Sequence, residues 1–295
     1  MTESQHNRIR TRPIWAFTKR RKNNAQFKNK ELVLTGLFTA IIIIMAFTPL
    51  GYIPLVVINA TIIHIPVILG SLFCGPKKGA FLGFVFGFTS CLKATIVGGT
   101  LSSFVFSPVL AASLVGTSGI FKSLFIAFVP RILVGVIPYF VYIGIKKVLA
   151  SEKKNLWGTV LNVLMSVFLA FGVYAFLGKM SESLSHAAAL GIGIAVGVVV
   201  FIVVEAVFIR KSTQVIPFVY AGVAGAMTNT LLVMGSIFVL YKDAYADAIG
   251  VAGNAVLGVI TGVISFNGVI EAIVAAIIVY LVGLVLNTIK PIAAK

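Results

Sequence analysis

Long apolar stretches separated by short basic groups make up most of the chain after residue 31. Predominantly apolar runs of 17 or more residues lie near 32–48, 56–74, 79–97, 121–145, 157–178, 187–209, 215–241 and 266–289. A helix needs about 20 such residues to cross a bilayer, whereas the strands of a membrane barrel span about ten residues of alternating hydropathy. The pattern therefore predicts an all-α, polytopic membrane helix bundle of about eight spans.

Two stretches do not follow this pattern cleanly. Residues 98–120 are apolar but interrupted by Gly, Ser and Pro, which favours a long loop packed on the outer side of the protein. Residues 244–264 lie directly before the last apolar run and form either a re-entrant or interfacial segment or a full crossing. We favour a segment that does not cross, because a crossing would move the basic C-terminus to the outside.

Basic residues are distributed very unevenly between the two predicted sides. Nine of the 24 lysines and arginines fall in residues 1–30, which we interpret as a basic cytoplasmic arm. With the N-terminus inside, nineteen of the 24 face the cytoplasm, and the other five are Lys93, Lys122, Arg131, Lys179 and Lys242. This asymmetry follows the positive-inside rule and predicts a multi-pass membrane protein with both termini cytoplasmic.

Composition narrows the possible functions. The 295 residues are 59% hydrophobic and 11% charged, with a mean hydropathy of +1.07, which is too apolar for a soluble domain. The net charge of +16 is concentrated in the arm without a folded nucleic-acid-binding motif, so we expect lipid headgroups rather than nucleic acid as its neighbours. No HExxH or GxSxG motif is present, and we therefore expect no enzyme, metal or cofactor.

Charged residues inside the predicted spans need a specific reason, because each costs at least about 2.5–3.5 kcal/mol at mid-bilayer. Arg131 follows Pro130 near the middle of its span, where it either contacts a ligand or pairs with Glu271 or helix carbonyls. Lys93 closes the outer end of its span, where it either extends to the headgroups or places a cation at the mouth of a pocket.

Uncharged polar residues fall in the same outer half of the bundle. Asn59 and His64 lie where an outer loop enters the second run, and His64 is either structural or a ligand contact. Asn229 belongs to a polar patch in the seventh run, and Asn267 lies four residues before Glu271 on one helical face. We therefore predict a cavity, open to the outside, that holds a small polar molecule.

Four segments resemble the substrate-binding S components of energy-coupling factor (ECF) transporters for vitamins. They run from Leu50 to Ser90, from Phe128 to Gly135 (FVPRILVG), from Ala221 to Phe238 (AGVAGAMTNTLLVMGSIF) and from Asn267 to Ala276 (NGVIEAIVAA). Within that family the pattern is most similar to the pantothenate-type members. The resemblance implies a six-helix receptor that captures a vitamin from outside and docks with a membrane coupling subunit and two cytoplasmic ATPases.

The same resemblance implies roles for particular regions. Small residues on the first helix, here Gly36 and Ala40, would form the docking face for the coupling subunit, and residues 49–56 and 98–120 would help to close over the ligand. The family usually has six helices, so this chain divides into an arm (1–30), core spans 1–4 (31–150), an inserted transmembrane hairpin (151–212) and core spans 5–6 (213–295). Arg131 or Lys93 would neutralise a ligand carboxylate.

Other functions remain open at this level. The ligand of an S component can be another vitamin or precursor, such as hydroxymethylpyrimidine, folate or riboflavin. An ion-coupled secondary carrier acting alone is the main alternative outside the class. Only Glu205 and Glu271 place carboxylates within the predicted spans, which is few for a carrier that must hold and relay an ion.

Overall fold

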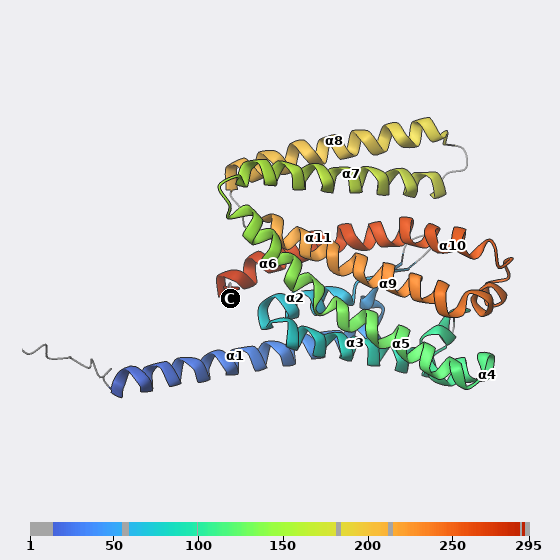
Figure 1. The fold of residues 1–295 in the computed structure, drawn as a ribbon, viewed down its shortest axis with the longest axis horizontal. Helices are drawn as coiled ribbons and strands as arrows, with labels where there is room; N and C mark the ends of the chain where they lie inside the picture. The colour runs from blue at the N-terminus through green and yellow to red at the C-terminus, as the bar shows by residue number, and fades with distance from the viewer. Residues whose placement is uncertain are drawn as a thin grey trace, which may run out of the picture.

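The computed structural model describes residues 14–54, 59–98, 100–180, 184–211, 215–289 and 291–292 (Figure 1). Within these ranges seven helices are long and apolar enough to cross a membrane. The prediction of an all-α, polytopic membrane helix bundle is therefore confirmed. The predicted count of eight spans needs one correction, which concerns the second apolar run.

The second run is a short hairpin followed by a short helix. After α1 (Ile14–Phe47) come η1 (Pro49–Gly51), the antiparallel strands β1 (Tyr52–Pro54) and β2 (Asn59–Thr61), and α2 (His64–Cys74). The eleven residues of α2 rise only about 16 Å, roughly half the hydrocarbon core. The predicted span 56–74 was wrong, because residues 59–61 pair with residues 52–54 as antiparallel strands instead of extending the helix.

The next part of the chain is also more helical than predicted. It contains α3 (Pro76–Ile96), η2 (Ser103–Val105), α4 (Pro108–Val115), α5 (Thr117–Val134) and α6 (Ile137–Leu149). The predicted loop 98–120 was therefore wrong in part, because Ser107 caps the N-terminus of α4 by accepting a hydrogen bond from the Leu110 amide. The predicted span 121–145 is interrupted at 135–136, just before Pro138 in the first turn of α6.

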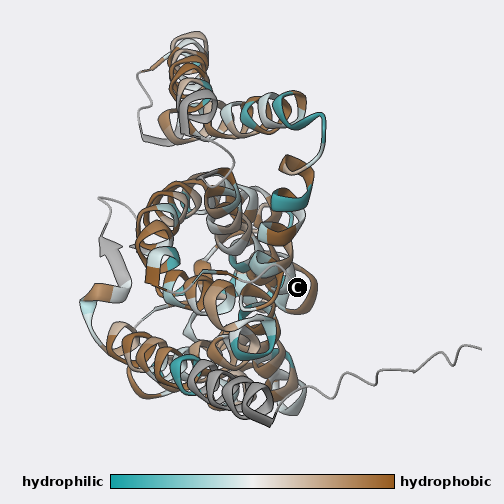
Figure 2. Cartoon of the chain, turned by 90° about the vertical axis from the view of Figure 1, so that its left-hand side faces the viewer, coloured by the Kyte–Doolittle hydropathy of each residue, from teal (hydrophilic) through white to brown (hydrophobic). Residues whose placement is uncertain are grey.

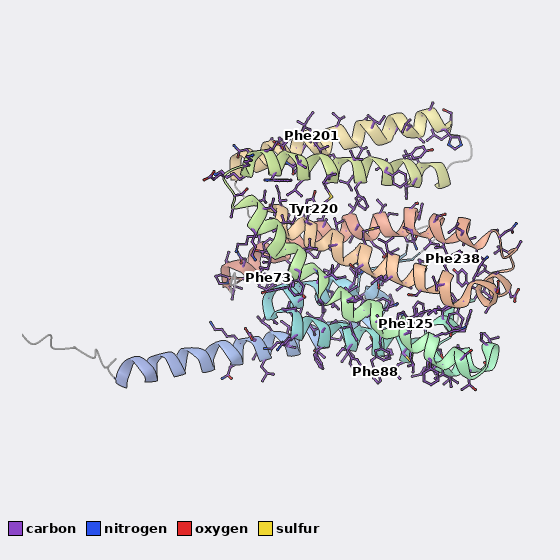
Figure 3. The ribbon with its side chains drawn as sticks, viewed as in Figure 1. Phe73, Phe88, Phe125, Phe201, Tyr220 and Phe238 are labelled. Atoms are coloured by element: carbon purple, nitrogen blue, oxygen red, sulfur yellow. The ribbon has the colours of Figure 1, made fainter. Side chains whose placement is uncertain are left out.

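The two runs between residues 151 and 212 form a helical hairpin. Helices α7 (Lys154–Met180) and α8 (His186–Lys211) pack along each other as a layer beside the remaining helices (Figure 1). Glu205 of α8 joins them, because its carboxylate accepts hydrogen bonds from Thr159 at 2.7 Å and from the Asn162 amide at 2.5 Å. Tyr220 of the following helix donates a hydrogen bond to the Leu161 carbonyl and so ties α7 to the main bundle (Figure 3).

The last two spans account for the region left open in the sequence. They are α9 (Val215–Ile249) and a continuous path through α10 (Val256–Val263), the π-helical segment η3 (Ile264–Gly268) and α11 (Val269–Ile289). Residues 244–264 are thus neither a re-entrant segment nor a separate crossing. Their first part completes α9, which ends at Gly250 with a φ of +71°, and their last part begins the final span.

The two ends of the bundle differ in charge. We call the end where α3 begins and where α6 and α11 end the basic end, because Lys77, Lys78, Lys146 and Lys147 belong to these helix termini. The end that carries α4 and the α9–α10 turn is the opposite end (Figure 1). Figure 2 looks onto the basic end and shows that the sides of the helices are mostly hydrophobic. Phe88 on α3 and Phe125 on α5 are each 48% exposed, as expected of lipid-facing side chains (Figure 3).

Close contact between α3 and α5 positions the interior of the bundle. Gly79, Gly83 and Gly87 are spaced four apart on α3, and a side chain at any of them would collide with backbone of the segment 127–135. Glycines at this spacing let two membrane helices touch backbone to backbone. A cluster of buried apolar residues from α1, α2, α3, α6, α9 and α11 forms an apolar core of the bundle.

Candidate functional site

A cavity of about 430 Å³ lies between α3, α5, α9, the last span and the segment 98–106. This volume is within the usual range for sites that bind small molecules. Polar groups from β2, α3, the 98–106 segment, α5, α9 and the last span meet there. The lining residues are Thr61, Phe86, Ser90, Lys93, Ala94, Gly98, Thr100, Ser102, Ser103, Phe106, Arg131, Asn229, Thr230, Val233, Met234, Val263, Asn267 and Glu271.

Arg131 supplies a buried cation to the cavity. Its position follows from Pro130, which has no N–H and so leaves the carbonyl of Ile126, four residues earlier, without its helical donor. The Arg131 Nη1 atom donates to that carbonyl at 2.7 Å. The guanidinium also lies 4.7 Å from the centre of the Phe106 ring and 5.5 Å from that of Phe86, at distances typical of cation–π contacts. Of the two roles considered for Arg131, the helix-carbonyl contact is present, and the side chain also lines the cavity.

Lys93, in the last turn of α3, lines the cavity beside the segment that follows it. Local hydrogen bonds hold this segment. The Ser103 hydroxyl donates to the Gly98 carbonyl at 3.1 Å and lies 2.8 Å from the Thr100 hydroxyl. The Thr95 hydroxyl lies 2.8 Å from that of Ser107, which links the end of α3 to the start of α4. One wall of the cavity is therefore a structured connection that the two flanking helices fix.

Glu271 connects three separate elements at the cavity. One carboxylate oxygen accepts a hydrogen bond from the Thr61 amide of β2 at 2.8 Å, and the other accepts one from the Thr230 hydroxyl of α9 at 3.0 Å. The side chain is only 5% exposed. Glu271 thus joins the β1–β2 hairpin to α9 and α11, and both of its carboxylate oxygens accept hydrogen bonds from the protein.

Asn229 and Asn267 place amide groups on the remaining walls. Asn229 is 8% exposed in the middle of α9, and Asn267 belongs to η3. Neither side-chain oxygen has a hydrogen-bond partner among the residues described, although both are shielded from solvent. Buried amide oxygens of this kind are normally satisfied, so these two are suited to accept hydrogen bonds from a bound molecule.

The structure brings together five of the predicted ligand-contact residues, namely Lys93, Arg131, Asn229, Asn267 and Glu271. His64 does not line the cavity: it is fully buried at the start of α2. The side chain of Asn59 lies outside the described part of the structure, and its backbone pairs with Pro54 in the hairpin. Gly36 and Ala40, the predicted docking residues, both lie on an exposed face of α1.

Several cavity residues were absent from the predicted set. Thr61 and Thr230 lie close in sequence to the predicted Asn59 and Asn229, but nothing in the pattern marks them as partners of Glu271. The aromatic rings of Phe86 and Phe106 resemble ordinary apolar span residues in sequence. The hydrogen bond from Arg131 to the Ile126 carbonyl could have been predicted from the sequence, because a proline inside a helix always leaves the carbonyl four residues earlier without its helical donor.

The arrangement is suited to binding. The cavity is large enough for a small organic anion. It is lined by two cations, by two amide oxygens and by one carboxylate that already accepts hydrogen bonds from the protein. No group of three or more His, Cys, Asp or Glu side chains that could hold a metal ion occurs among the described residues.

Comparison with known proteins identifies related sequences. A family model described as "ECF transporter, substrate-specific component" matches residues 30–209. The "Pantothenic acid transporter PanT" of Lactococcus lactis subsp. cremoris is 42% identical over 157 residues, which cover 49% of this chain and 76% of the relative. The "Pantothenate transporter PanT" of Leuconostoc mesenteroides subsp. mesenteroides is 26% identical over 273 residues, which cover 91% and 96% of the two chains.

Proposed function

Because this chain belongs to the family of substrate-specific components of ECF transporters, we propose that it captures pantothenate outside a bacterial cell and passes it to an ATP-driven import complex. The observation that carries the choice of ligand is the pair of cations, Arg131 and Lys93, on the wall of one cavity. The printed names of both relatives support the same choice.

The charges of the cavity favour a ligand with a single negative charge. Glu271 offsets one of the two cations, and hydrogen bonds from Thr61 and Thr230 already stabilise its carboxylate. The three charged residues that line the cavity therefore sum to a net charge of +1. The planar guanidinium of Arg131 has five N–H donors and can bind a carboxylate with two parallel hydrogen bonds. Pantothenate carries one carboxylate at physiological pH.

The uncharged walls suit the rest of the molecule. Pantothenate has hydroxyl groups and an amide N–H, all of which donate hydrogen bonds. The side-chain oxygens of Asn229 and Asn267 face the same cavity as acceptors without partners among the described residues. A bound molecule that donates to both would remove the cost of leaving buried acceptors unsatisfied, which is about 1–3 kcal/mol each.

Orientation and energy coupling follow from the charge distribution and the family. The basic end faces the cytoplasm under the positive-inside rule, which places both termini inside and the cavity in the outer half of the membrane. We assign the exposed small residues Gly36 and Ala40 of α1 to the contact with the membrane coupling subunit, where short side chains allow close helix approach. Two cytoplasmic ATPase subunits would supply the energy.

Ligand binding to the purified protein in lipid nanodiscs tests the proposal. We expect isothermal titration calorimetry to detect saturable binding of pantothenate. Arg131→Ala should weaken it between about 10-fold and about 150-fold, because a charge-assisted hydrogen bond contributes about 1.5–3 kcal/mol. Lys122→Ala is the matched control, since Lys122 lies on the same helix, also near an aromatic ring at 5.6 Å, but does not line the cavity. It should bind as the unmodified protein does.

A neutral analogue makes the test specific for charge. Pantothenyl alcohol, in which a hydroxymethyl group replaces the carboxylate, should bind the unmodified protein more weakly than pantothenate does. It should lose little further affinity in Arg131→Ala. Equal affinity for the two compounds would contradict the role given to Arg131, and absence of pantothenate binding would contradict the ligand. Pantothenate uptake by vesicles that contain this chain alone would favour a secondary carrier instead.

A further inference from the structure

The last span contains an irregular segment at the level of the cavity. Residues 264–268 form the π-helical segment η3, and Asn267 within it lines the cavity. π-Helical turns are rare and are frequently found at functional sites. Contacts around the segment must therefore stabilise it.

On the side of the cavity, η3 packs against α9. Gly268 lies next to Thr230, since a side chain at Gly268 would approach the Thr230 Cγ2 atom to 3.1 Å. Thr230 in turn donates its hydroxyl to Glu271. The segment is thus continuous with the polar wall of the cavity on one side.

On its other side, η3 packs against α7 of the helical hairpin. The rings of Phe266 and Phe176 stack with centroids 4.8 Å apart and planes inclined by 14°. Phe266 is only 3% exposed. One turn before Phe176, the absence of a side chain at Gly172 lets α7 approach Val269 directly, because a Cβ atom there would overlap the valine side chain. The hairpin therefore covers the outer side of the irregular segment where lipid would otherwise lie.

Helix α7 is itself held in place. The hydrogen bond from Tyr220 to the Leu161 carbonyl fixes it to α9, and the bonds from Thr159 and Asn162 to Glu205 fix it to α8. By contrast, α8 has mostly exposed apolar side chains and is the least buried of the membrane-spanning helices described. Of the two hairpin helices, α7 is therefore the one that supports η3.

We propose that the α7–α8 hairpin is a brace for the binding site, in which Phe176 and Gly172 are positioning residues that keep η3 in the conformation that presents Asn267 to the ligand. Neither residue lines the cavity. The ligand-binding part of this inference rests on the proposed function. Its structural part does not, because the conformation of η3 can be followed without any ligand.

The first experiment measures hydrogen–deuterium exchange in ligand-free protein in nanodiscs. Phe176→Ala should speed amide exchange across 264–268 by about 2-fold to about 12-fold, the effect of losing an aromatic stacking contact. Phe171→Ala is the matched control on the same helix, since Phe171 is 57% exposed. Unchanged exchange in Phe176→Ala, or equal acceleration in both variants, would overturn the brace even if pantothenate binds well.

The second experiment is a double-mutant cycle on pantothenate affinity. Phe176→Ala should weaken binding between about 2-fold and about 30-fold in the otherwise unmodified protein, the usual range for residues that act at a distance. In an Asn267→Ala background it should weaken binding much less, because the group it positions is gone. Phe176→Tyr, which keeps the ring, should restore the affinity. Equal losses in both backgrounds would show a general loss of stability and overturn the inference, whereas no pantothenate binding by any variant contradicts only the proposed ligand.

Discussion

Replacing Glu271 by Gln should release the β1–β2 hairpin from the cavity wall. The carboxylate accepts hydrogen bonds from the Thr61 amide at 2.8 Å and from the Thr230 hydroxyl at 3.0 Å. A hydrogen bond to a charged group contributes about 1.5–3 kcal/mol, and one between neutral groups about 0.5–1.5 kcal/mol. Glutamine has nearly the same shape and keeps one acceptor oxygen, so the substitution removes mainly the charge. We expect the attachment of the hairpin through the hydrogen bonds of Glu271 to weaken by about 1–2 kcal/mol.

That loss corresponds to an increase of about 5-fold to about 30-fold in the population of the released hairpin. Hydrogen–deuterium exchange of the amides around Thr61 in ligand-free protein measures this population directly. Affinity for an anion is a poorer readout, because removal of a negative charge from the cavity would by itself strengthen anion binding. Glu271→Ala, which leaves the partly buried Thr61 amide without its acceptor, should exchange faster still.

The control for Glu271 is Glu205→Gln. Glu205 is also a carboxylate within a membrane-spanning helix that accepts two hydrogen bonds, but it joins α7 to α8 and does not line the cavity. The same substitution there should leave exchange around Thr61 unchanged. Two results would contradict this reasoning. One is exchange around Thr61 in Glu271→Gln at the rate of the unmodified protein, and the other is equal acceleration of that exchange in Glu205→Gln. Either would show that the hydrogen bonds of Glu271 do not hold the hairpin.

Two further predictions concern the scaffold of the cavity. Gly83→Val should lower the free energy of unfolding by about 1–3 kcal/mol and weaken ligand binding, because the new side chain meets the Arg131 carbonyl. Thermal unfolding followed by tryptophan fluorescence measures the loss, and Gly36→Val, whose position is open, should show little of it. Ser107→Ala should cost about 1 kcal/mol through loss of the α4 cap and should speed amide exchange in 98–107. Ser113→Ala, at an exposed position of the same helix, is expected to change neither quantity.

Hydropathy alone predicted most of the spans because the bilayer requires long apolar helices with few exceptions. The errors share a cause. At 56–74 a run of sufficient length and apolarity was interpreted as one helix, because its hydropathy does not reveal that residues 59–61 pair with the preceding strand. At 244–264 the single residue Gly250, with its positive φ, decides where one helix stops, and a hydropathy average does not detect it.

The candidate site was predictable to the extent that membrane burial makes polar residues costly. That reasoning selected Lys93, Arg131, Asn229, Asn267 and Glu271 before their proximity was known, because each needs a polar neighbour inside the bilayer. It could not select the residues of the 98–106 segment, since Gly, Ser and Thr are common in loops of every kind. It also gave no reason for the π-helical turn at Asn267, which depends on packing between segments far apart in the chain.

The bond between Arg131 and the Ile126 carbonyl bears on the affinity that the proposed site can reach. A free arginine side chain loses about 2 kcal/mol of rotamer entropy when a ligand immobilises it. Here the guanidinium is already held by a carbonyl of its own helix and by two aromatic rings. That ordering takes place during folding, so a carboxylate bound there, as we propose, would retain more of its interaction energy as affinity.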